Sequence, residues 1–337
     1  MKALGLISGG LDSQLAIRLI LDQGIDVEAV YFSNIFATSA GMTTKPNIAT
    51  VIKELGNIPL HIVDVNKEML SIVKKPRYGY GSAMNPCIDC RIMSFMAAKK
   101  LMKKIGAKFI ITGEVLGQRP MSQRKDTIKL IEKNSTLEGY IVRPLSAKIL
   151  PTSIPEEKGW INREKLLDVS GRSRKTQIEL ANKYGFKAFS TPAGGCLLTE
   201  KLFANRLRES YAHKEDKLQD IETLKLGRHF RIHDKIKCIV GRNEKENDII
   251  EELAQPGDII IRPVIVPGPT LLLRNCSIEN SPEYFNLTTT LFLKYCKIKE
   301  NVTVEYGTAG KKGIEWKGEI TVSSDERSAD LPGITHI

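Results

Sequence analysis

The chain has 337 residues, of which 42% are hydrophobic and 26% are charged. These values are typical of a globular protein with two or three domains, and because no apolar run approaches about 20 residues, they exclude a membrane-spanning helix. The amino end also lacks a basic region followed by a long apolar run. We therefore expect neither a signal peptide nor a membrane partner, and we place the protein in the cytoplasm.

Basic residues outnumber acidic ones, since 50 Lys and Arg against 39 Asp and Glu give a formal net charge of +11. Lys and Arg release counterions when they neutralise phosphates, so this excess favours a polyanionic partner, and nucleic acid is the leading candidate. The alternative is a solvated Lys/Glu surface. The positions of the basic clusters along the chain have to decide between the two.

The first predicted elements are a strand over 3–7 and a helix over 13–23, joined by the turn Ser-Gly-Gly-Leu-Asp-Ser at 8–13. Gly9 and Gly10 let backbone amide groups approach an anion. Ser8 and Ser13 add hydroxyl donors, and the helix dipole favours negative charge at this end. The turn therefore predicts a site for a phosphorylated ligand.

Asp12 in this turn would repel phosphate unless a divalent cation lay between them, so the turn predicts Mg²⁺ as well as a nucleotide. It is not a Walker loop or a dinucleotide fingerprint, because the residues that define those motifs are missing. Similar glycine-rich turns also occur with no ligand. The six residues resemble the motif of the PP-loop ATPases (ATP pyrophosphatases). That resemblance implies cleavage of ATP between the α and β phosphates, giving an adenylated substrate and pyrophosphate.

Further strands are predicted over 27–32, 60–65 and 109–112, and helices over 46–55 and 91–105. Gly24 and Gly106 stand where helix C-caps are expected. Alternation of strands and helices predicts an α/β fold with a doubly wound parallel sheet, in which ligands bind at the carboxyl ends of the strands. The PP-loop resemblance implies that this sheet belongs to a HUP-like domain.

Two segments at the carboxyl ends of predicted strands are expected to contact the ligand. In the first, Tyr31-Phe32-Ser33-Asn34, the apolar flank of Phe32 would hold adenine, and the alternative is that Tyr31 and Phe32 belong to the core. The second segment is 112–123. Its residue Glu114 is expected to contact the ligand, and the alternative is that it caps the next turn. The candidate ATP and substrate contacts of the second segment are Gly113, Glu114, Gly117, Gln118, Arg119 and Gln123.

After about residue 143, three prolines predict a loop that crosses the surface. Two basic segments follow this loop, and we expect both to contact RNA phosphates; the alternative is simple solvent exposure of helix ends. Their basic residues are Arg172, Arg174 and Lys175 at a predicted helix start, and Arg206 and Arg208 further on.

From about residue 212 the chain contains short strand-like runs separated by turn residues, which predict a small α+β or mostly β module. The runs cover 229–233, 236–240, 258–264, 271–273, 288–293, 302–306 and 319–322. The region resembles RNA-binding modules of ribosome-associated and tRNA-modifying proteins. We therefore expect three parts: a PP-loop core over 1–145, an extension over 146–211 with a distal cysteine, and an RNA-binding module over 212–337.

Three of the six cysteines favour an interpretation in terms of metal or sulfur chemistry. Cys87 and Cys90 form a Cys-x-x-Cys pair on one turn, and Cys196 follows paired glycines that would expose its sulfur. Three thiolates can bind zinc or leave one iron of a [4Fe–4S] cluster open to sulfide. A redox pair, a persulfide relay and three unrelated buried thiols are the alternatives.

Four segments in order resemble the tRNA-thiolating PP-loop ATPases, the 4-thiouridine and 2-thiouridine synthetases. They are the turn at 8–13, Cys87-x-x-Cys90, the segment 112–123 and Cys196. The resemblance covers about residues 1–210. It implies that Cys87, Cys90 and Cys196 hold a [4Fe–4S] cluster, in preference to zinc, and that ATP and Mg²⁺ are the other cofactors.

The resulting hypothesis is an ATP-dependent tRNA sulfurtransferase that adenylates a uridine carbonyl and replaces its oxygen with sulfur. Asp12 would hold the metal and the three cysteines would deliver sulfur from free sulfide or from a persulfide-carrying protein. Its partners would be tRNA, the sulfur donor and, as one option, a second copy of the chain. The alternatives are a PP-loop amidating ligase that adenylates a carboxylate, and a non-catalytic RNA-binding protein that senses nucleotide.

Overall fold

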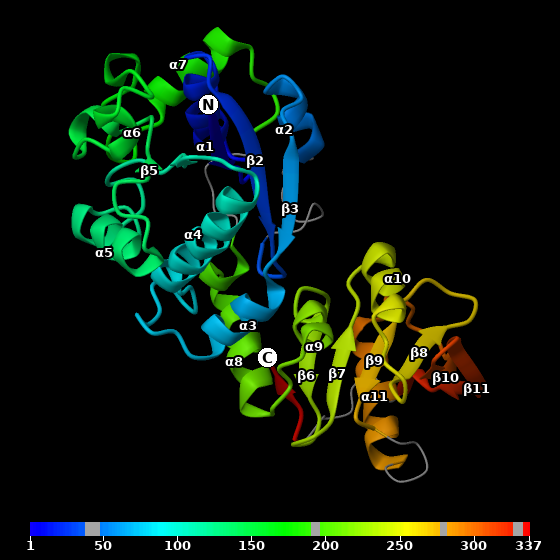
Figure 1. Cartoon of the computed structure of the whole chain (residues 1–337). Helices are drawn as coiled ribbons and strands as arrows, with labels where there is room; N and C mark the ends of the chain where they lie inside the picture. Colours follow the sequence, from blue (N-terminus) through cyan, green and yellow to red (C-terminus); the bar gives the residue numbers. More distant parts are fainter. Residues whose placement is uncertain (38–47, 190–195, 277–281, 326–332) are drawn as a thin grey trace. The chain divides into compact units, whose positions relative to one another are not determined.

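The computed structural model describes residues 1–37, 48–189, 196–276, 282–325 and 333–337 (Figure 1). Compact packing divides the chain into two units, Met1–Glu200 and Lys201–Ile337. Each unit has its own sheet and its own hydrophobic core. The boundary at residue 200 lies inside the extension predicted for 146–211, and the functional division into three parts stays a prediction.

The first unit contains a five-stranded sheet with the order β3-β2-β1-β4-β5, and every neighbouring pair is parallel. Its strands are β1 (Lys2–Leu6), β2 (Asp26–Ser33), β3 (Leu60–Asp64), β4 (Ile110–Ile111) and β5 (Ile141–Val142). Parallel strands need a crossover between them, and in this unit the crossovers carry helices. The predicted parallel α/β sheet is confirmed.

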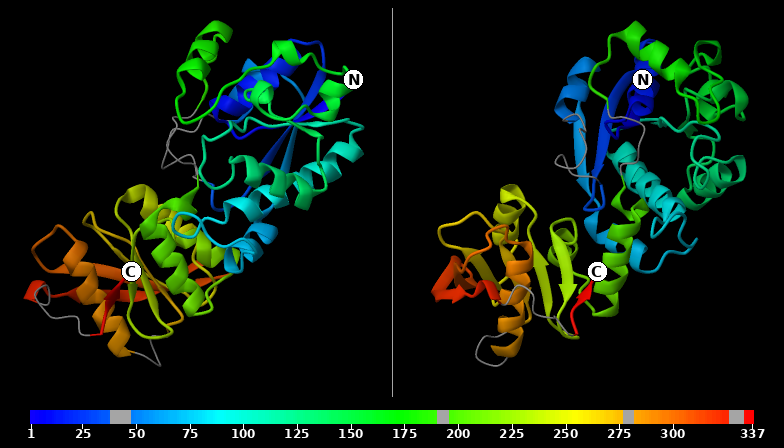
Figure 2. Two further views of the ribbon diagram at one scale, coloured as in Figure 1. Left: turned by 90° about the vertical axis from the view of Figure 1, so that its left-hand side faces the viewer. Right: turned by 180° about the vertical axis from the view of Figure 1, so that it is seen from behind.

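Helices cover both faces of this sheet, as the views in Figures 1 and 2 show. Residues of α1, α2 and α7 form one core with Ala3, Val27 and Ile111, and residues of α4 and α5 form a second core with Leu4 and Val30. The helices are α1 (Leu11–Leu21), α2 (Ile48–Glu54), α3 (Asn66–Lys74), α4 (Cys87–Lys104), α5 (Lys125–Ser135), α6 (Ile154–Glu157) and α7 (Lys175–Tyr184), with 3-10 turns η1 (Ala147–Ile149), η2 (Arg163–Lys165) and η3 (Leu197–Thr199). The sheet is therefore doubly wound.

The glycines predicted to end two helices do so. Gly24 and Gly106 have φ values of +76° and +72°, and each donates its amide to a carbonyl in the last turn of the preceding helix, α1 and α4 respectively. A side chain at a left-handed position is costly, so glycine is the residue that suits it. Both predicted helix ends are confirmed.

The segment that begins near residue 143 is predicted to be a surface loop, but its first residues are buried. Residues 141–147 are all buried, and β5 lies at their start, beside β4. Ser146 is fully buried and donates its hydroxyl to the carbonyl of Val169 at 2.6 Å. Proline often marks a surface turn, but Pro144 follows an edge strand of only two residues, where a missing amide costs little. The prediction is wrong for these residues because tertiary packing covers them.

The second unit contains a seven-stranded sheet with the order β11-β10-β8-β9-β7-β6-β12 and antiparallel neighbours. Its strands are β6 (Arg228–Arg231), β7 (Lys237–Val240), β8 (Ile259–Pro263), β9 (Leu271–Arg274), β10 (Val302–Gly310), β11 (Gly313–Val322) and β12 (Thr335–His336). Its helices are α8 (Lys201–Ala212), α9 (Leu218–Thr223), α10 (Glu244–Glu252) and α11 (Pro282–Tyr295). Of the two predicted classes, the structure is α+β.

One predicted strand of this unit is a helix. Residues 288–293 lie in α11, where all six are buried. The run of three threonines favours a strand by propensity, but inside α11 each threonine hydroxyl donates to a backbone carbonyl three or four residues earlier. Burial of Leu291, Phe292 and Leu293 against the sheet core then outweighs the strand propensity.

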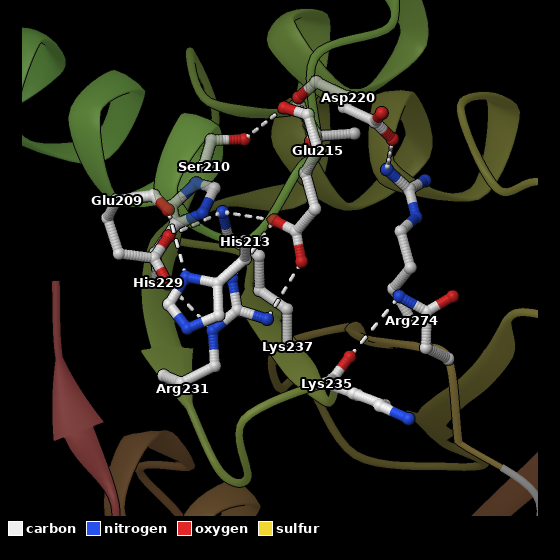
Figure 3. A network of polar contacts seen from close by, with 12 residues as sticks. Glu209, Ser210, His213, Glu215, Asp220, His229, Arg231, Lys235, Lys237 and Arg274 are labelled. Carbon is white, nitrogen blue, oxygen red and sulfur yellow. Dashed lines mark hydrogen bonds and ion pairs between the residues drawn. The ribbon is translucent and has the colours of Figure 1, made fainter.

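A buried network of charges stabilises the second unit near the start of its sheet. Figure 3 shows Arg231 and Lys237 directed toward Glu209 and Glu215. Arg231 donates to both oxygens of Glu215 at 2.8 and 3.0 Å, and the Lys237 ammonium lies 3.1 Å from Glu209 and 3.2 Å from Glu215. Burial raises the pKa of the Glu215 carboxyl, but the two cations outweigh it, so this pKa lies below the ordinary value of 4.5.

Replacing Glu215 with glutamine should lower the free energy of unfolding of the second unit by about 3 kcal/mol at pH 7, because it leaves buried cations short of a partner. A carboxyl with a lowered folded-state pKa stabilises above its unfolded pKa and loses that stabilisation as the pH falls through the folded value. Denaturant titrations at pH 7 and below pH 4.5 should therefore show a smaller acid effect in the variant. The exposed Glu252→Gln is the control, and an equal effect of both changes would contradict the prediction.

Candidate active site

The hydroxyl of Ser13 holds the turn at 8–13 in shape. Gly9 has a φ of +74°, which suits glycine. The Ser13 hydroxyl donates to the carbonyl of Gly10 at 2.8 Å and accepts from the amide of Ser8 at 3.3 Å. Ser13 is 6% exposed whereas Ser8 is exposed. The hydroxyl of Ser13 therefore closes the turn, and Ser8 is the serine that faces outward at the start of α1.

Asp12, in the first turn of α1, has one satisfied and one unsatisfied carboxylate oxygen. Its Oδ2 accepts from the side-chain amide of Gln118 at 3.1 Å. Its Oδ1 is buried and lacks a hydrogen-bond partner among the described residues. An unpaired buried carboxylate oxygen is costly unless a ligand completes it. The residues thus fit the Mg²⁺ predicted for this position, since hard cations prefer carboxylate oxygens.

The segment after β4 lies directly against this turn. A Cβ atom at Gly113 would lie 2.4 Å from the Asp12 carbonyl carbon and 2.4 Å from the Ser13 nitrogen. Only glycine allows two backbones to approach so closely. Gly113 therefore packs against the turn itself, and its contact with ATP stays a prediction.

The four residues predicted at the end of β2 divide between the core and the local backbone. Tyr31 packs against the core that contains α1, and Phe32 packs against the core that contains α4. Asn34 accepts from the amide of Phe36 at 3.0 Å and so shapes the loop after β2. Tyr31 and Phe32 remain half-buried, and the adenine contact of Phe32 stays a prediction.

Glu114 and Gln123 have partners within the protein. Glu114 is 1% exposed; its Oε2 accepts from Arg143 at 3.0 Å, and its Oε1 lies 3.4 Å from Arg91. Gln123 is 2% exposed and accepts from the amide of Arg119 at 3.0 Å. The Oε1 of Glu114 is nevertheless buried without a hydrogen-bond partner among the described residues, so the ligand contacts of both side chains stay predictions. Both residues also position arginines or their backbone.

The three predicted cysteines come from two separate segments. Cys87 is the first residue of α4, and Cys90 follows one turn later. Cys196 forms a β-bridge with Ala37, just beyond β2. The amide of Met84 donates to the carbonyl of Leu198 at 3.0 Å, which joins the segment before α4 to the one after Cys196. The glycines predicted to expose Cys196, at 194 and 195, lie outside the described residues.

The thiols of Cys87, Cys90 and Cys196 influence one another electrostatically, and all three residues are half-buried. Burial, with a smaller contribution from the thiols of Cys90 and Cys87, raises the pKa of Cys196 to about 12. Burial also raises the pKa of Cys87, which the guanidinium groups of Arg91 and Arg119 partly oppose. Because metals bind the thiolate form, a bound cation has to offset the cost of these buried charges.

Among the residues that the structure describes, no group of three Cys, His, Asp or Glu side chains is placed to hold a single metal ion. Zinc would need sulfurs roughly 3.8 Å apart around one centre, given Zn–S bonds of about 2.3 Å. A four-iron cluster is larger, and its cysteine ligands lie farther apart. The choice between a cluster and zinc for the three thiols stays a prediction.

The segment 116–123 joins the two halves of the site. Gln118 donates to Asp12, while the charge of the next residue, Arg119, acts on Cys87 and Cys196. The predicted nucleotide turn and the predicted sulfur site are therefore neighbours within the first unit. Sequence reasoning missed Arg91, whose only signal is its place directly after Cys90.

The predicted RNA-binding arginines differ in their surroundings. Arg172 and Lys175 are exposed near the start of α7, and Arg174 is half-exposed there. Arg208 is exposed and donates to Asn205 at 3.0 Å. These residues stay candidates for phosphate contacts.

Arg206 is a correction to that list. It is 6% exposed, and its guanidinium donates to the carbonyls of Leu224 and Gly227, both at 3.0 Å. Burial, together with the charge of Arg242, lowers its pKa to about 10. Arg206 therefore connects α8 to the start of the sheet and cannot reach RNA phosphates, because its helix turns it inward.

Residues 1–148 match the family model described as Thiamine biosynthesis protein (ThiI). Over 148 residues the chain is 34% identical to a probable tRNA sulfurtransferase of Thermoanaerobacter sp. (strain X514), and over 149 residues it is 32% identical to one of Staphylococcus aureus (strain Newman). Residues 1–148 thus resemble a ThiI-type domain. The resemblance to tRNA-thiolating PP-loop enzymes is thereby confirmed for this part of the chain.

The match to the ThiI-type domain covers 43% of this chain and 36% and 34% of the two relatives, so the chain spans about a third of their length. Residues 227–327 match a second model, NFACT protein RNA binding domain. The names of the tRNA sulfurtransferase relatives therefore concern one domain of this protein, and the second unit is similar to a different family.

Two solved structures resemble the chain more distantly. A 4-thiouridine synthetase–RNA complex with bound ATP has a TM-score of 0.39 and 22% identity, covering 66% of this chain and 51% of that one. The U34-tRNA thiolase NcsA from Methanococcus maripaludis with its [4Fe–4S] cluster has a TM-score of 0.31 and 14% identity, covering 67% and 70%. Both scores are below 0.5, so the family assignment depends on the sequence matches. In the described ranges, no helix is long and apolar enough to cross a membrane.

Proposed function

We propose that this protein is an ATP-dependent tRNA sulfurtransferase that replaces a uridine carbonyl oxygen with sulfur. The observation that carries the proposal is the segment 116–123, in which adjacent residues contact Asp12 and act on Cys87 and Cys196. Activation of the oxygen and delivery of sulfur have to occur at one base, so the two sets of residues must be neighbours. An amidating ligase needs only the first set.

The turn at 8–13 would hold ATP. Its backbone amides and the Ser8 hydroxyl would bind the phosphates that leave as pyrophosphate, and Asp12 would hold Mg²⁺ through its unpaired Oδ1. Mg²⁺, when bound, neutralises charge on the phosphate oxygens. The uridine oxygen attacks the α phosphorus, the bond to the β phosphate breaks, and the base becomes adenylated.

Cys87, Cys90 and Cys196 would hold the sulfur-transfer group. A [4Fe–4S] cluster held by three cysteines supplies, when bound, an iron that is open to exogenous sulfide. Arg91 and Arg119 would offset negative charge at the three sulfurs, and buried Glu114 holds Arg91 in place. Sulfur adds to the ring carbon, and AMP leaves with the original uridine oxygen.

Two groups of residues would bind tRNA. Three cations near the start of α7, the exposed Arg172 and Lys175 and the half-exposed Arg174, would contact phosphates beside the site. Arg208 would contact phosphates from α8. The second unit would hold the body of the RNA, as its match to an RNA-binding domain suggests. Together they would let an unstacked base reach the turn at 8–13.

The test is an anaerobic reaction of the full chain with tRNA, ATP, Mg²⁺ and sulfide, followed by nucleoside mass spectrometry. The expected result is a thiolated uridine together with equal amounts of AMP and pyrophosphate. Pyrophosphate released only with a carboxylate and ammonia would establish the amidating ligase instead. RNA binding without any tRNA-dependent pyrophosphate would establish a nucleotide-sensing RNA-binding protein.

A further inference from the structure

An exposed tryptophan lies on the sheet of the second unit, in the edge strand β11. Trp316 is 38% exposed although it is one of only two tryptophans in the chain. It pairs in register with Gly307 of β10, a residue that has no side chain to cover the ring. By strand alternation its side chain is on the same face as Ile260, which packs against α10. Trp316 therefore lies on the α10 face of the sheet, in a part that is open to solvent.

Arg262 of β8 holds this ring in place. Its guanidinium lies 4.3 Å from the centroid of the Trp316 ring. Arg262 is itself fixed by two carboxylates, since it donates to Glu305 at 2.7 Å and to Glu251 at 2.9 Å. A cation that is fixed on both sides cannot swing away, so the ring is pre-organised with one face covered and part of its surface free.

Positive charge lies at the turn of the same hairpin, whereas beside the ring Lys317 forms an ion pair with Glu315 at 3.3 Å. The two-residue turn between β10 and β11 is Lys311-Lys312, and both side chains are exposed. Neither lysine forms an ion pair with any residue that the structure describes. Lys312 and Trp316 are four residues apart, or roughly 13 Å at about 3.3 Å per residue. Phosphates at the turn and a base at the ring would suit a short single-stranded segment.

We propose that Trp316 is a stacking platform for a base of single-stranded RNA, with Lys311 and Lys312 contacting the neighbouring phosphates. Every base has a flat face, so an aromatic platform beside lysines binds RNA with little sequence preference. The occupant is argued from charge complementarity. The inference rests on the proposed function in taking RNA as the ligand, and it adds the surface of the second unit that binds it.

The first test uses tryptophan fluorescence. Trp160 stacks on Phe109 in the first unit, so Trp160→Phe keeps an aromatic ring there and leaves Trp316 as the sole tryptophan. Titrating this full-length variant with an oligouridylate should quench the Trp316 emission, with the same midpoint that fluorescence anisotropy of labelled RNA reports. RNA binding without quenching would overturn the proposal.

The second test compares matched variants by their affinity for the same RNA. Stacking contributes about 1–3 kcal/mol per base, so Trp316→Ala should weaken binding roughly 5- to 150-fold, whereas Trp316→Phe should retain most of it. The double change Lys311→Gln with Lys312→Gln should make the dependence of log K for RNA binding on log salt concentration shallower by about 1.4, because each lost phosphate contact contributes about 0.7 to the slope. Lys201→Gln with Lys214→Gln is a control of equal charge outside the hairpin, since both lysines are exposed.

The proposal would be overturned if the Trp316→Ala variant bound RNA as tightly as the parent protein. It would also be overturned if sedimentation showed a dimer that Trp316→Ala abolishes, because β11 would then mediate contacts between two copies of the chain. These measurements are independent of sulfur transfer. Quenching without thiolation would leave the stacking platform in place and reject the proposed function. Thiolation without quenching would support the proposed function and reject the stacking platform.

Discussion

Replacing Asp12 with alanine should lower tRNA-dependent release of pyrophosphate by roughly 10²- to 10³-fold or more, the range seen when one stabilising group of a reaction centre is lost. The change removes the carboxylate oxygen that lacks a partner among the described residues, and with it the proposed contact to Mg²⁺. The iron content should stay the same, because Asp12 is not one of the three cysteines that we propose hold the cluster. Pyrophosphate assay and iron analysis on the same preparation check both parts.

Asp126→Ala is the matched control for this prediction. Asp126 is exposed in the first turn of α5, as Asp12 is in the first turn of α1, and it has no role in the proposed site. Its replacement should leave pyrophosphate release near the parent value. Loss of iron in Asp12→Ala would show that the nucleotide and sulfur groups are not separable in the way we propose.

Replacing Cys196 with alanine should remove the brown chromophore of anaerobically prepared protein and most of its iron. A cluster with only two cysteine ligands, Cys87 and Cys90, is left with two unprotected irons, so the cluster should not persist through purification. Absorbance spectra and iron and acid-labile sulfide analysis make the measurement without reference to activity. ATP binding should be nearly unchanged, since Cys196 does not contact the turn at 8–13.

Cys276→Ala is the control for the cysteine prediction. Cys276 is buried in the second unit and packs in that unit's own core, so its loss should leave the iron content unchanged. Full retention of iron in Cys196→Ala would exclude that residue as a ligand. Equal loss of iron in both variants would point to general unfolding, and a melting curve of each variant makes that distinction directly.

The local parts of the fold follow from the sequence because they depend on neighbouring residues. The turn at 8–13, the glycine helix ends at 24 and 106 and most strands of both units are found where they are predicted. The predictions that are wrong depend on tertiary packing. Residues 288–293 have strand propensity yet form part of α11, and the predicted surface loop is buried over 143–147. Packing against distant residues decided both.

The candidate site divides in the same way. The residue types themselves, a Ser-Gly-Gly-x-Asp-Ser turn and three cysteines, are enough to indicate nucleotide and sulfur chemistry. Their proximity cannot be read from the chain, because Asp12 and Gln118 lie far apart in sequence and meet only in the folded unit, where the charge of Arg119 also acts on Cys196. The inward turn of Arg206 is equally a matter of packing. Sequence determined which chemical groups are present, and the tertiary structure decided which of them meet, since long-range contacts depend on how the helices and strands pack.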